Sequence, residues 1–335
     1  MAEQELPFAQ RAGFIAGPAK SGTTLLVSLL DGNPELLVFP AETAYFPTAL
    51  KKWASRGRRA QFDYLTNESF ARVLFGAPPR PGKHTYNDFP KKEFLEHFEK
   101  SAFDPANKDR DLLVLMIESY AAVRGIDLSK VKRWIEKTPA NRDHLDAILE
   151  RFPQAKILVT LRDPRAIMAA QIALEKTRRT GRFSTYYVAA HWRKAVQLAL
   201  QIHRGSRPGF VVQYEKLVSE TEQTMREVCA YLGVTFSPEM LAPTKAGQPW
   251  AGNSAAKTGF TSVSTEPAFR WRNELNEDEI GWIEWHCRDF MPAFGYEPQQ
   301  PKRRIGPWLK PVRGERPREY LKSRFHSLRD RVLKR

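Results

Sequence analysis

The sequence has few cysteines and no long hydrophobic run. Cys229 and Cys287 are the only cysteines in 335 residues, and both lie among apolar residues with helical spacing. This setting favours two buried free thiols over a disulfide or a metal site. The apolar stretch Asp111–Val123 is too short to span a bilayer and carries a glutamate. The first 14 residues lack the charged start and apolar run of a signal peptide, so we expect a cytoplasmic protein.

Positive charge is concentrated at the end of the chain. There are 53 Lys and Arg against 38 Asp and Glu, a net charge of +15. Residues 301–335 hold 13 Lys and Arg and 3 Asp and Glu, so this tail contributes +10 and the main body +5. A mildly basic body gives no reason to expect a nucleic-acid partner. Apolar residues in 316–335 have near-helical spacing, which predicts a basic helix that either packs on the body or attaches to an anionic membrane surface or acidic acceptor.

Predicted strands and helices alternate along the chain. Short apolar runs predict buried strands at 13–17, 156–161 and 210–213. Helical spacing and stop signals predict helices at 23–31, 164 to about 175, about 186–203, and 219–232. This alternation predicts an α/β fold, a P-loop-like three-layer α/β/α arrangement with a mainly parallel central sheet. A single domain would span 1–300 with a helical, substrate-side insertion at 47–131, followed by the basic tail at 301–335.

The segment GPAKSGTT joins the first predicted strand to the first predicted helix. The backbone N–H groups and dipole of a helix that begins there favour an anion. A Walker A loop places its lysine directly after the second glycine, whereas Lys20 comes two residues before Gly22. On spacing alone, the segment is either an unusual anion-binding loop or a turn made of small residues.

Two further motifs are ambiguous when taken separately. Lys137 precedes Thr138-Pro139, and proline restricts the backbone of the residue before it. This lysine is either a site residue or an ordinary surface lysine before a helix. Arg162 follows the strand predicted at 156–161, at the sheet edge where α/β proteins bind ligands. Its guanidinium suits a phosphate, or it forms a salt bridge with Asp163 or another neighbour.

In this order and spacing, the three motifs resemble the sulfotransferases that use 3′-phosphoadenosine 5′-phosphosulfate (PAPS). The resemblance covers residues 13–296, because it extends through the later runs Tyr214-Glu215-x-Leu217, Tyr231-Leu232-Gly233, Phe269-Arg270-Trp271-Arg272 and Met291…Phe294-Gly295-Tyr296. It is closer to the carbohydrate, protein-tyrosine and bacterial branch than to the cytosolic phenol and steroid branch. The resemblance implies in-line transfer of a sulfuryl group from PAPS to an acceptor hydroxyl of a sugar, tyrosine or small alcohol, with release of PAP and no metal.

The resemblance also assigns roles to individual residues. Lys20 would reach the bridging oxygen of the phosphosulfate, and Lys137 would help to polarise the sulfuryl group. The loop donors would be Ser21, Gly22, Thr23 and Thr24, and the remaining cofactor-binding candidates are Arg162, Tyr214, Lys257, Arg270 and Arg272. The family usually has a serine eight residues after the arginine that binds the 3′-phosphate. This chain has Ala170 there, so we expect Gln171 or another group to substitute.

The acceptor hydroxyl loses a proton as it attacks sulfur, so a base is required. The carbohydrate branch uses a glutamate after the first helix, and Glu42, 22 residues after Lys20, matches it in position. The alternative is a glutamate that stabilises a helix start. His84 is the reserve candidate for the base.

Two other function classes stay open. A nucleotide-dependent kinase would need a lysine after Gly22 and carboxylates that hold a metal, and no acidic cluster supplies them. A non-catalytic protein that binds polyanions on the same fold is favoured by Ala170, but simple binding does not need a base such as Glu42.

Overall fold

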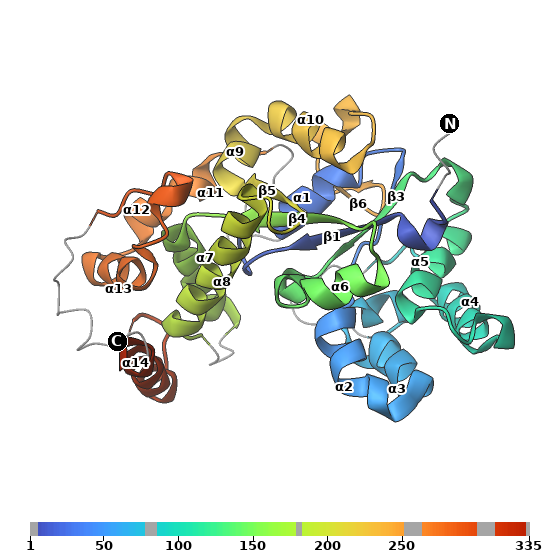
Figure 1. Ribbon diagram of the computed structural model, residues 1–335, viewed down its shortest axis with the longest axis horizontal. Coiled ribbons are helices and arrows are strands. Elements are labelled where there is room, and N and C mark those ends of the chain that lie inside the picture. Colours follow the sequence, from blue (N-terminus) through green and yellow to red (C-terminus); the bar gives the residue numbers. More distant parts are fainter. Residues whose placement is uncertain (1–5, 78–85, 179–182, 251–262, 300–311, 333–335) are drawn as a thin grey trace.

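A five-stranded parallel sheet forms the centre of the molecule (Figure 1). The computed structural model describes residues 6–77, 86–178, 183–250, 263–299 and 312–332. The strand order is β2-β3-β1-β4-β5, and every neighbouring pair is parallel. The strands are β1 Ala12–Ala16, β2 Leu36–Val38, β3 Arg133–Lys137, β4 Lys156–Leu161 and β5 Phe210–Gln213. The predicted α/β fold with a mainly parallel sheet is confirmed.

The sequence predicts three of the five strands. β4 and β5 have the predicted bounds, and β1 begins and ends one residue earlier than predicted. β2 and β3 have no such signal. β2 is only three residues long, and Arg133, Glu136 and Lys137 interrupt the apolar character of β3. A short antiparallel hairpin, β6 Thr244–Lys245 and β7 Gln248–Pro249, lies outside the central sheet.

Helices cover both faces of the sheet because its strands alternate apolar side chains between the two faces. Ile15 of β1 packs with Leu26 and Leu29 of α1, whereas the adjacent Phe14 packs in another cluster with Trp134 and Phe152. In Figure 1, α1, α9 and α10 lie on one side of the sheet and α6, α7 and α8 on the other. The helices are α1 Thr23–Leu30, α2 Lys51–Trp53, α3 Gly57–Asp63, α4 Lys91–Phe103, α5 Leu112–Val123, α6 Leu145–Arg151, α7 Pro164–Arg178, α8 Thr185–His203, α9 Tyr214–Ser219, α10 Thr221–Leu232, α11 Glu266–Phe269, α12 Trp271–Glu274, α13 Glu277–Cys287 and α14 Pro317–Val332.

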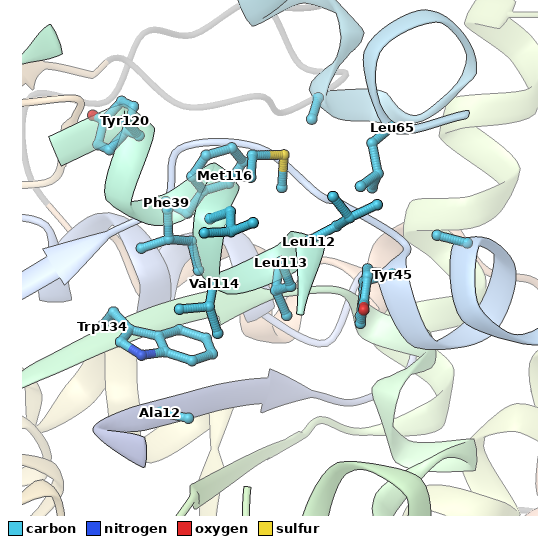
Figure 2. Packing of buried hydrophobic residues seen from close by; sticks show 14 of the residues in the cluster. Ala12, Phe39, Tyr45, Leu65, Leu112, Leu113, Val114, Met116, Tyr120 and Trp134 are labelled. Carbon is cyan, nitrogen blue, oxygen red and sulfur yellow. The ribbon is translucent and has the colours of Figure 1, made fainter. Parts of the chain in front are cut away.

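The apolar stretch at 111–123 forms α5, which is a core helix. Figure 2 shows Leu113 and Val114 of α5 on the same side of the sheet as Ala12 of β1 and Trp134 of β3. No helix in the described ranges combines the length and the apolar character needed to cross a membrane. The segment 47–131 holds α2, α3, α4 and α5, and α5 belongs to the helical layer against the sheet. Its assignment as the substrate side stays a prediction.

The remaining sequence-based expectations concern the cysteines and the tail. Cys229 and Cys287 are both buried free thiols, as predicted. The tail forms α14, and Figure 1 shows this helix beside α13 at the end of the molecule opposite α4. Within the described part of the tail, residues 317–332 are helical.

Candidate active site

One predicted site residue lies at or after the end of each strand of the central sheet. Lys20, Glu42 and Arg162 lie in the connections that follow β1, β2 and β4. Lys137 is the last residue of β3, and Tyr214, the first residue of α9, directly follows β5. Because all five strands are parallel, their carboxyl ends meet at one edge. Ligands of open α/β sheets bind outside this edge. The topology therefore brings together residues that lie nearly 200 positions apart in the sequence.

The loop from Gly17 to Gly22 has a fixed and unusual backbone. Gly17 and Gly22 have φ angles of +147° and +98°, and Lys20 adopts the left-handed region at +72° although it is not a glycine. A side chain at Gly17 would collide with Thr160. The Ser21 hydroxyl donates to the carbonyl of Pro18 at 2.7 Å and lies 2.5 Å from the Thr160 hydroxyl. Buried contacts thus hold the loop against β4, and the Ser21 hydroxyl is one of them.

Gly22 lies against an aromatic ring at the start of α1. A Cβ atom added to Gly22 would lie 2.5 Å from Cδ2 of Tyr214, so only glycine allows the ring to pack there. Gly22 is the N-cap residue of α1, which begins at Thr23. Unpaired N–H groups in the first turn of a helix favour an anion at this position.

Lys137 lies between the loop and the predicted base. Its Nζ is 2.5 Å from Oε1 of Glu42 and 3.5 Å from Oγ1 of Thr24. The Lys137 side chain is 9% exposed and that of Glu42 is 25% exposed, so the carboxylate is the more accessible partner. The structure therefore joins two predicted catalytic residues in one ion pair beside the first turn of α1.

Glu136 fixes the segment that carries Glu42. Glu136 is not among the site residues predicted from the sequence. Its buried Oε1 accepts hydrogen bonds from the backbone N–H and hydroxyl of Thr43 at 3.2 and 2.9 Å, and from the Thr138 hydroxyl at 2.6 Å. Its Oε2 accepts from Nδ2 of Asn141 at 2.8 Å. Burial raises the pKa of Glu136, and the four hydrogen bonds oppose this effect. Its only signal in the sequence is a charged residue directly before Lys137.

Arg142 is a second residue without a sequence signal. Its Nη1 donates to the carbonyl of Gly17 at 2.9 Å and to that of Pro139 at 3.1 Å. Arg142 therefore joins the start of the loop after β1 to the turn after β3.

Arg162, which follows β4, holds the loop from Gly17 to Gly22 by a hydrogen bond to its backbone. Its Nη1 donates to the carbonyl of Lys20 at 2.9 Å, its Nη2 donates to that of Pro267, and its guanidinium lies 4.1 Å from the centre of the Tyr214 ring. Burial lowers the pKa of Arg162, and the nearby charge of Arg270 adds to this lowering. Asp163, the suggested salt-bridge partner, pairs instead with Arg165 at 2.7 Å.

The Nε atoms of Arg162 and Arg270 are buried and have no hydrogen-bond partner within the described ranges. Arg270 lies 3.5 Å from Glu274, farther than a good hydrogen bond. The charge of Arg270 acts on Arg162, and each of the two guanidinium groups has a buried Nε that makes no hydrogen bond, so together they form a site suited to an anion.

The other candidates are less central or lie outside the described residues. Arg272 is exposed on α12, and its guanidinium lies 5.1 Å from the centre of the Phe269 ring. Gln171 is half-buried on α7, next to Ala170. Lys257 and His84 fall outside the residues that the structure describes.

The comparisons with known proteins agree with this geometry. The model of the sulfotransferase family matches residues 14–238, so the chain belongs to that family. Protein-tyrosine sulfotransferase 2 of Gallus gallus is 22% identical over 299 residues, which cover 85% of this chain and 69% of the relative. Carbohydrate sulfotransferase 2 of Mus musculus is 32% identical over 95 residues, which cover 26% of this chain and 17% of the relative.

A solved sulfotransferase structure shares the fold. The sulfotransferase domain from the curacin biosynthetic pathway has a TM-score of 0.52 at 19% identity and covers 88% of this chain and 100% of that domain. The likeness to this domain is evidence for the fold alone. Family membership and fold together identify the chain as a sulfotransferase.

Proposed function

We propose that the chain transfers the sulfuryl group of PAPS to an acceptor hydroxyl and releases PAP. The observation that carries this proposal is the position of Lys137, whose ammonium group contacts both Glu42 and Thr24. In-line transfer must bring the acceptor hydroxyl, which lies beside the carboxylate base, to the donor, which is bound at the start of the helix. The Lys137 cation lies between these two positions. Neither phosphate binding alone nor a structural ion pair requires this combination.

The residues at the sheet edge fit a donor with phosphate at both its 5′ and 3′ positions. The loop and the first turn of α1, with Lys20, Thr23 and Thr24, would hold the phosphosulfate end. Arg162 and Arg270, whose buried Nε atoms make no hydrogen bond, would hold the 3′-phosphate. Tyr214 packs against both Gly22 and Arg162, so it lies between these two regions.

The chemistry assigned to the chain is proton removal and charge neutralisation. PAPS would supply the sulfuryl group. Glu42 is a partly exposed carboxylate, and it would accept the proton of the acceptor hydroxyl. Lys20 and Lys137 would neutralise negative charge on the leaving oxygen and the sulfuryl oxygens. The described residues contain no group of three metal-ligating side chains, and these two cations would replace a metal.

The acceptor belongs to the hydroxyl class. The named relatives act on protein tyrosine and on carbohydrate, which supports a tyrosine or a sugar hydroxyl ahead of a small alcohol. The glutamate base supports a sugar hydroxyl, because by resemblance such a base belongs to the carbohydrate branch.

The proposal is tested by thermal unfolding with PAP, with ATP, and with ATP plus Mg²⁺. A ligand that binds only the native state stabilises it by about 2.7 kcal/mol at 100 times its Kd. We expect PAP alone to raise the midpoint, in Glu42→Gln as much as in the wild type. A shift only with ATP and Mg²⁺ would instead indicate a kinase, and no shift with PAP would overturn the donor assignment.

Transfer of labelled sulfate from PAPS to a tyrosine peptide and to a sugar then tests the reaction. Loss of a general base lowers the rate by about 10²–10⁴-fold, so we expect Glu42→Gln to retain PAP binding and lose transfer. Glu222→Gln is the matched control, because Glu222 is exposed on α10 and forms a surface ion pair with Arg226. A PAP shift without transfer to either acceptor, even by the wild type, would support a non-catalytic binding protein.

A further inference from the structure

One face of α14 is firmly packed on the body of the protein. The hydroxyl of Ser323 donates to Oε1 of Glu315 at 2.7 Å, and the same oxygen accepts a hydrogen bond from the Thr185 hydroxyl at 3.1 Å. The guanidinium of Arg324 lies 4.6 Å from the centre of the Trp282 ring. Contacts with α8 and α13 therefore fix the orientation of the helix.

The opposite face of α14 exposes two large apolar side chains. Leu321 is 65% exposed and Phe325 is 66% exposed. The next most exposed large hydrophobic residues in the described ranges, Tyr187 and Phe269, reach 44%. Positions four residues apart lie on the same side of a helix, so Leu321 and Phe325 form one continuous apolar ridge. Solvent exposure of such a ridge is unfavourable unless a partner covers it.

Cations accompany this ridge. Arg318 and Lys322 lie on the same helical face, three positions before Leu321 and Phe325 respectively. Arg318 is exposed, and Lys322 forms an ion pair with Glu319 at 3.0 Å. The 301–335 segment carries a net charge of +10, two thirds of that of the whole chain. The partner must therefore accept apolar side chains and also carry negative charge.

We propose that the Leu321–Phe325 face of α14 docks on a bilayer surface that contains anionic lipids. A helix with aliphatic and aromatic side chains beside Lys and Arg binds at the boundary between headgroups and acyl chains. The apolar side chains enter this boundary while the cations attract the anionic headgroups. A lipid surface satisfies both features of the face at once.

Two other occupants fit the face less well. A second copy of the chain would bring the same positive charge against itself, and like charges repel across a symmetric interface. A nucleic acid would attract the cations, but the Leu321 side chain has no role in contacts to a charged phosphate backbone.

The test is co-sedimentation of the full chain with phosphatidylcholine vesicles, with and without added phosphatidylglycerol. The test variant is Leu321→Ser with Phe325→Ser, which retains every cation of the tail. Phe103→Ser is the matched control, because Phe103 is 40% exposed on α4, far from α14 in Figure 1. Leu321 and Phe325 are 65% and 66% exposed in the native state, so we expect the unfolding midpoint of the double variant to stay near that of the wild type.

We expect the wild type and Phe103→Ser to bind the anionic vesicles and the double variant to lose at least about tenfold in binding. Binding should also weaken at about 0.5 M salt, where charge attraction is screened. Equal binding by the double variant would overturn the proposal, because adsorption would then depend on charge alone. Failure of the wild type to bind anionic vesicles would also overturn the proposal. So would a lower molar mass of the lipid-free double variant than of the wild type, because the face would then bind a second copy of the chain. Each readout is independent of sulfuryl transfer.

Discussion

Oε1 of Glu136 accepts hydrogen bonds from both the backbone N–H and the hydroxyl of Thr43, the residue that follows Glu42. The partners lie 93 positions apart in the sequence. Glu136 is also the neighbour of Lys137, so adjacent residues of β3 hold both the predicted base and the segment that carries it. The next residue of that segment, Ala44, has a left-handed backbone at φ +50° and donates to the Thr138 hydroxyl at 3.1 Å. We infer that Glu136 is a positioning residue for Glu42.

Substitution of Glu136 tests this positioning role. Glu136→Ala leaves the buried donors of Thr43, Thr138 and Asn141 without their acceptor, so we expect a loss of about 2–4 kcal/mol in the free energy of unfolding. Glu136→Gln retains one oxygen, and its new N–H₂ group can donate to the buried and unpaired Oδ1 of Asn141 after that amide flips. We therefore expect Gln to rescue sulfuryl transfer that Ala abolishes. Equal transfer by both variants would contradict the positioning role.

The pH dependence of stability provides a second test at Glu136. Burial raises the pKa of this carboxyl above its unfolded value of about 4.3, so the native state holds the proton to higher pH than the unfolded state. Its contribution to the free energy of unfolding is therefore greatest below about pH 4.3 and falls as the pH rises through the native pKa. Urea unfolding at several pH values should show a flatter profile for Glu136→Gln than for the wild type. An unchanged slope would mean that Glu136 does not titrate in this way.

Gly22→Ala should damage the donor loop. The new Cβ would lie 2.5 Å from the Tyr214 ring, and the φ of +98° disfavours any L side chain. We expect a loss of about 1–3 kcal/mol in stability and a clear loss of the PAP-induced shift. Gly233→Ala is the matched control, because Gly233 has φ +73° and no atom within 4 Å of an added Cβ. The prediction fails if the two variants are equally destabilised and bind PAP equally well.

A buried ion-pair network supports the segment that carries Arg270. Arg165 binds Asp163 at 2.7 Å and Glu284 at 2.8 Å, and its guanidinium lies 4.0 Å from the centre of the Trp271 ring. Loss of one partner leaves a buried charge poorly compensated, so Glu284→Ala should cost about 3–5 kcal/mol in urea unfolding. Glu222→Ala, at an exposed pair, should cost less than about 1 kcal/mol. Similar costs for the two variants would show that the buried network contributes little to stability.

The parts of the fold and site that follow from local pattern could be predicted from the sequence. β4 is apolar after its first residue except at Thr160, and the loop containing Lys20 lies between a recognisable strand and helix. The role of Glu136 could not be predicted, because it depends on the pairing of β2 with β3 and on a contact between distant segments. β3 itself gave no signal, since charged residues occupy positions that an apolar pattern would require.

The position of Arg162 shows a similar limit. Its place at the end of β4 follows from the sequence, but its hydrogen bonds to the carbonyls of Lys20 and Pro267 depend on how distant loops pack. Local pattern therefore placed Lys20 and Arg162 at the sheet edge, and the family resemblance added Glu42, Lys137 and Tyr214, whereas tertiary packing determines what each one contacts there.

Arg270 and Arg272 are predicted to differ in their effect on the donor site. Arg270 has a buried Nε that makes no hydrogen bond and lies 3.5 Å from Glu274, whereas Arg272 is exposed and lies over the Phe269 ring. A lost charge-assisted hydrogen bond costs about 1.5–3 kcal/mol, so Arg270→Gln should weaken PAP binding by about 10–100-fold. AMP, which lacks the 3′-phosphate, should bind both forms equally, and Arg272→Gln should change PAP binding less than about threefold. Calorimetric titration with PAP and AMP distinguishes these cases. An equal loss of PAP and AMP affinity in Arg270→Gln would place this arginine elsewhere on the donor. A larger loss of PAP affinity in Arg272→Gln would reverse the assignment, because the exposed guanidinium would then have to turn inward to reach the phosphate.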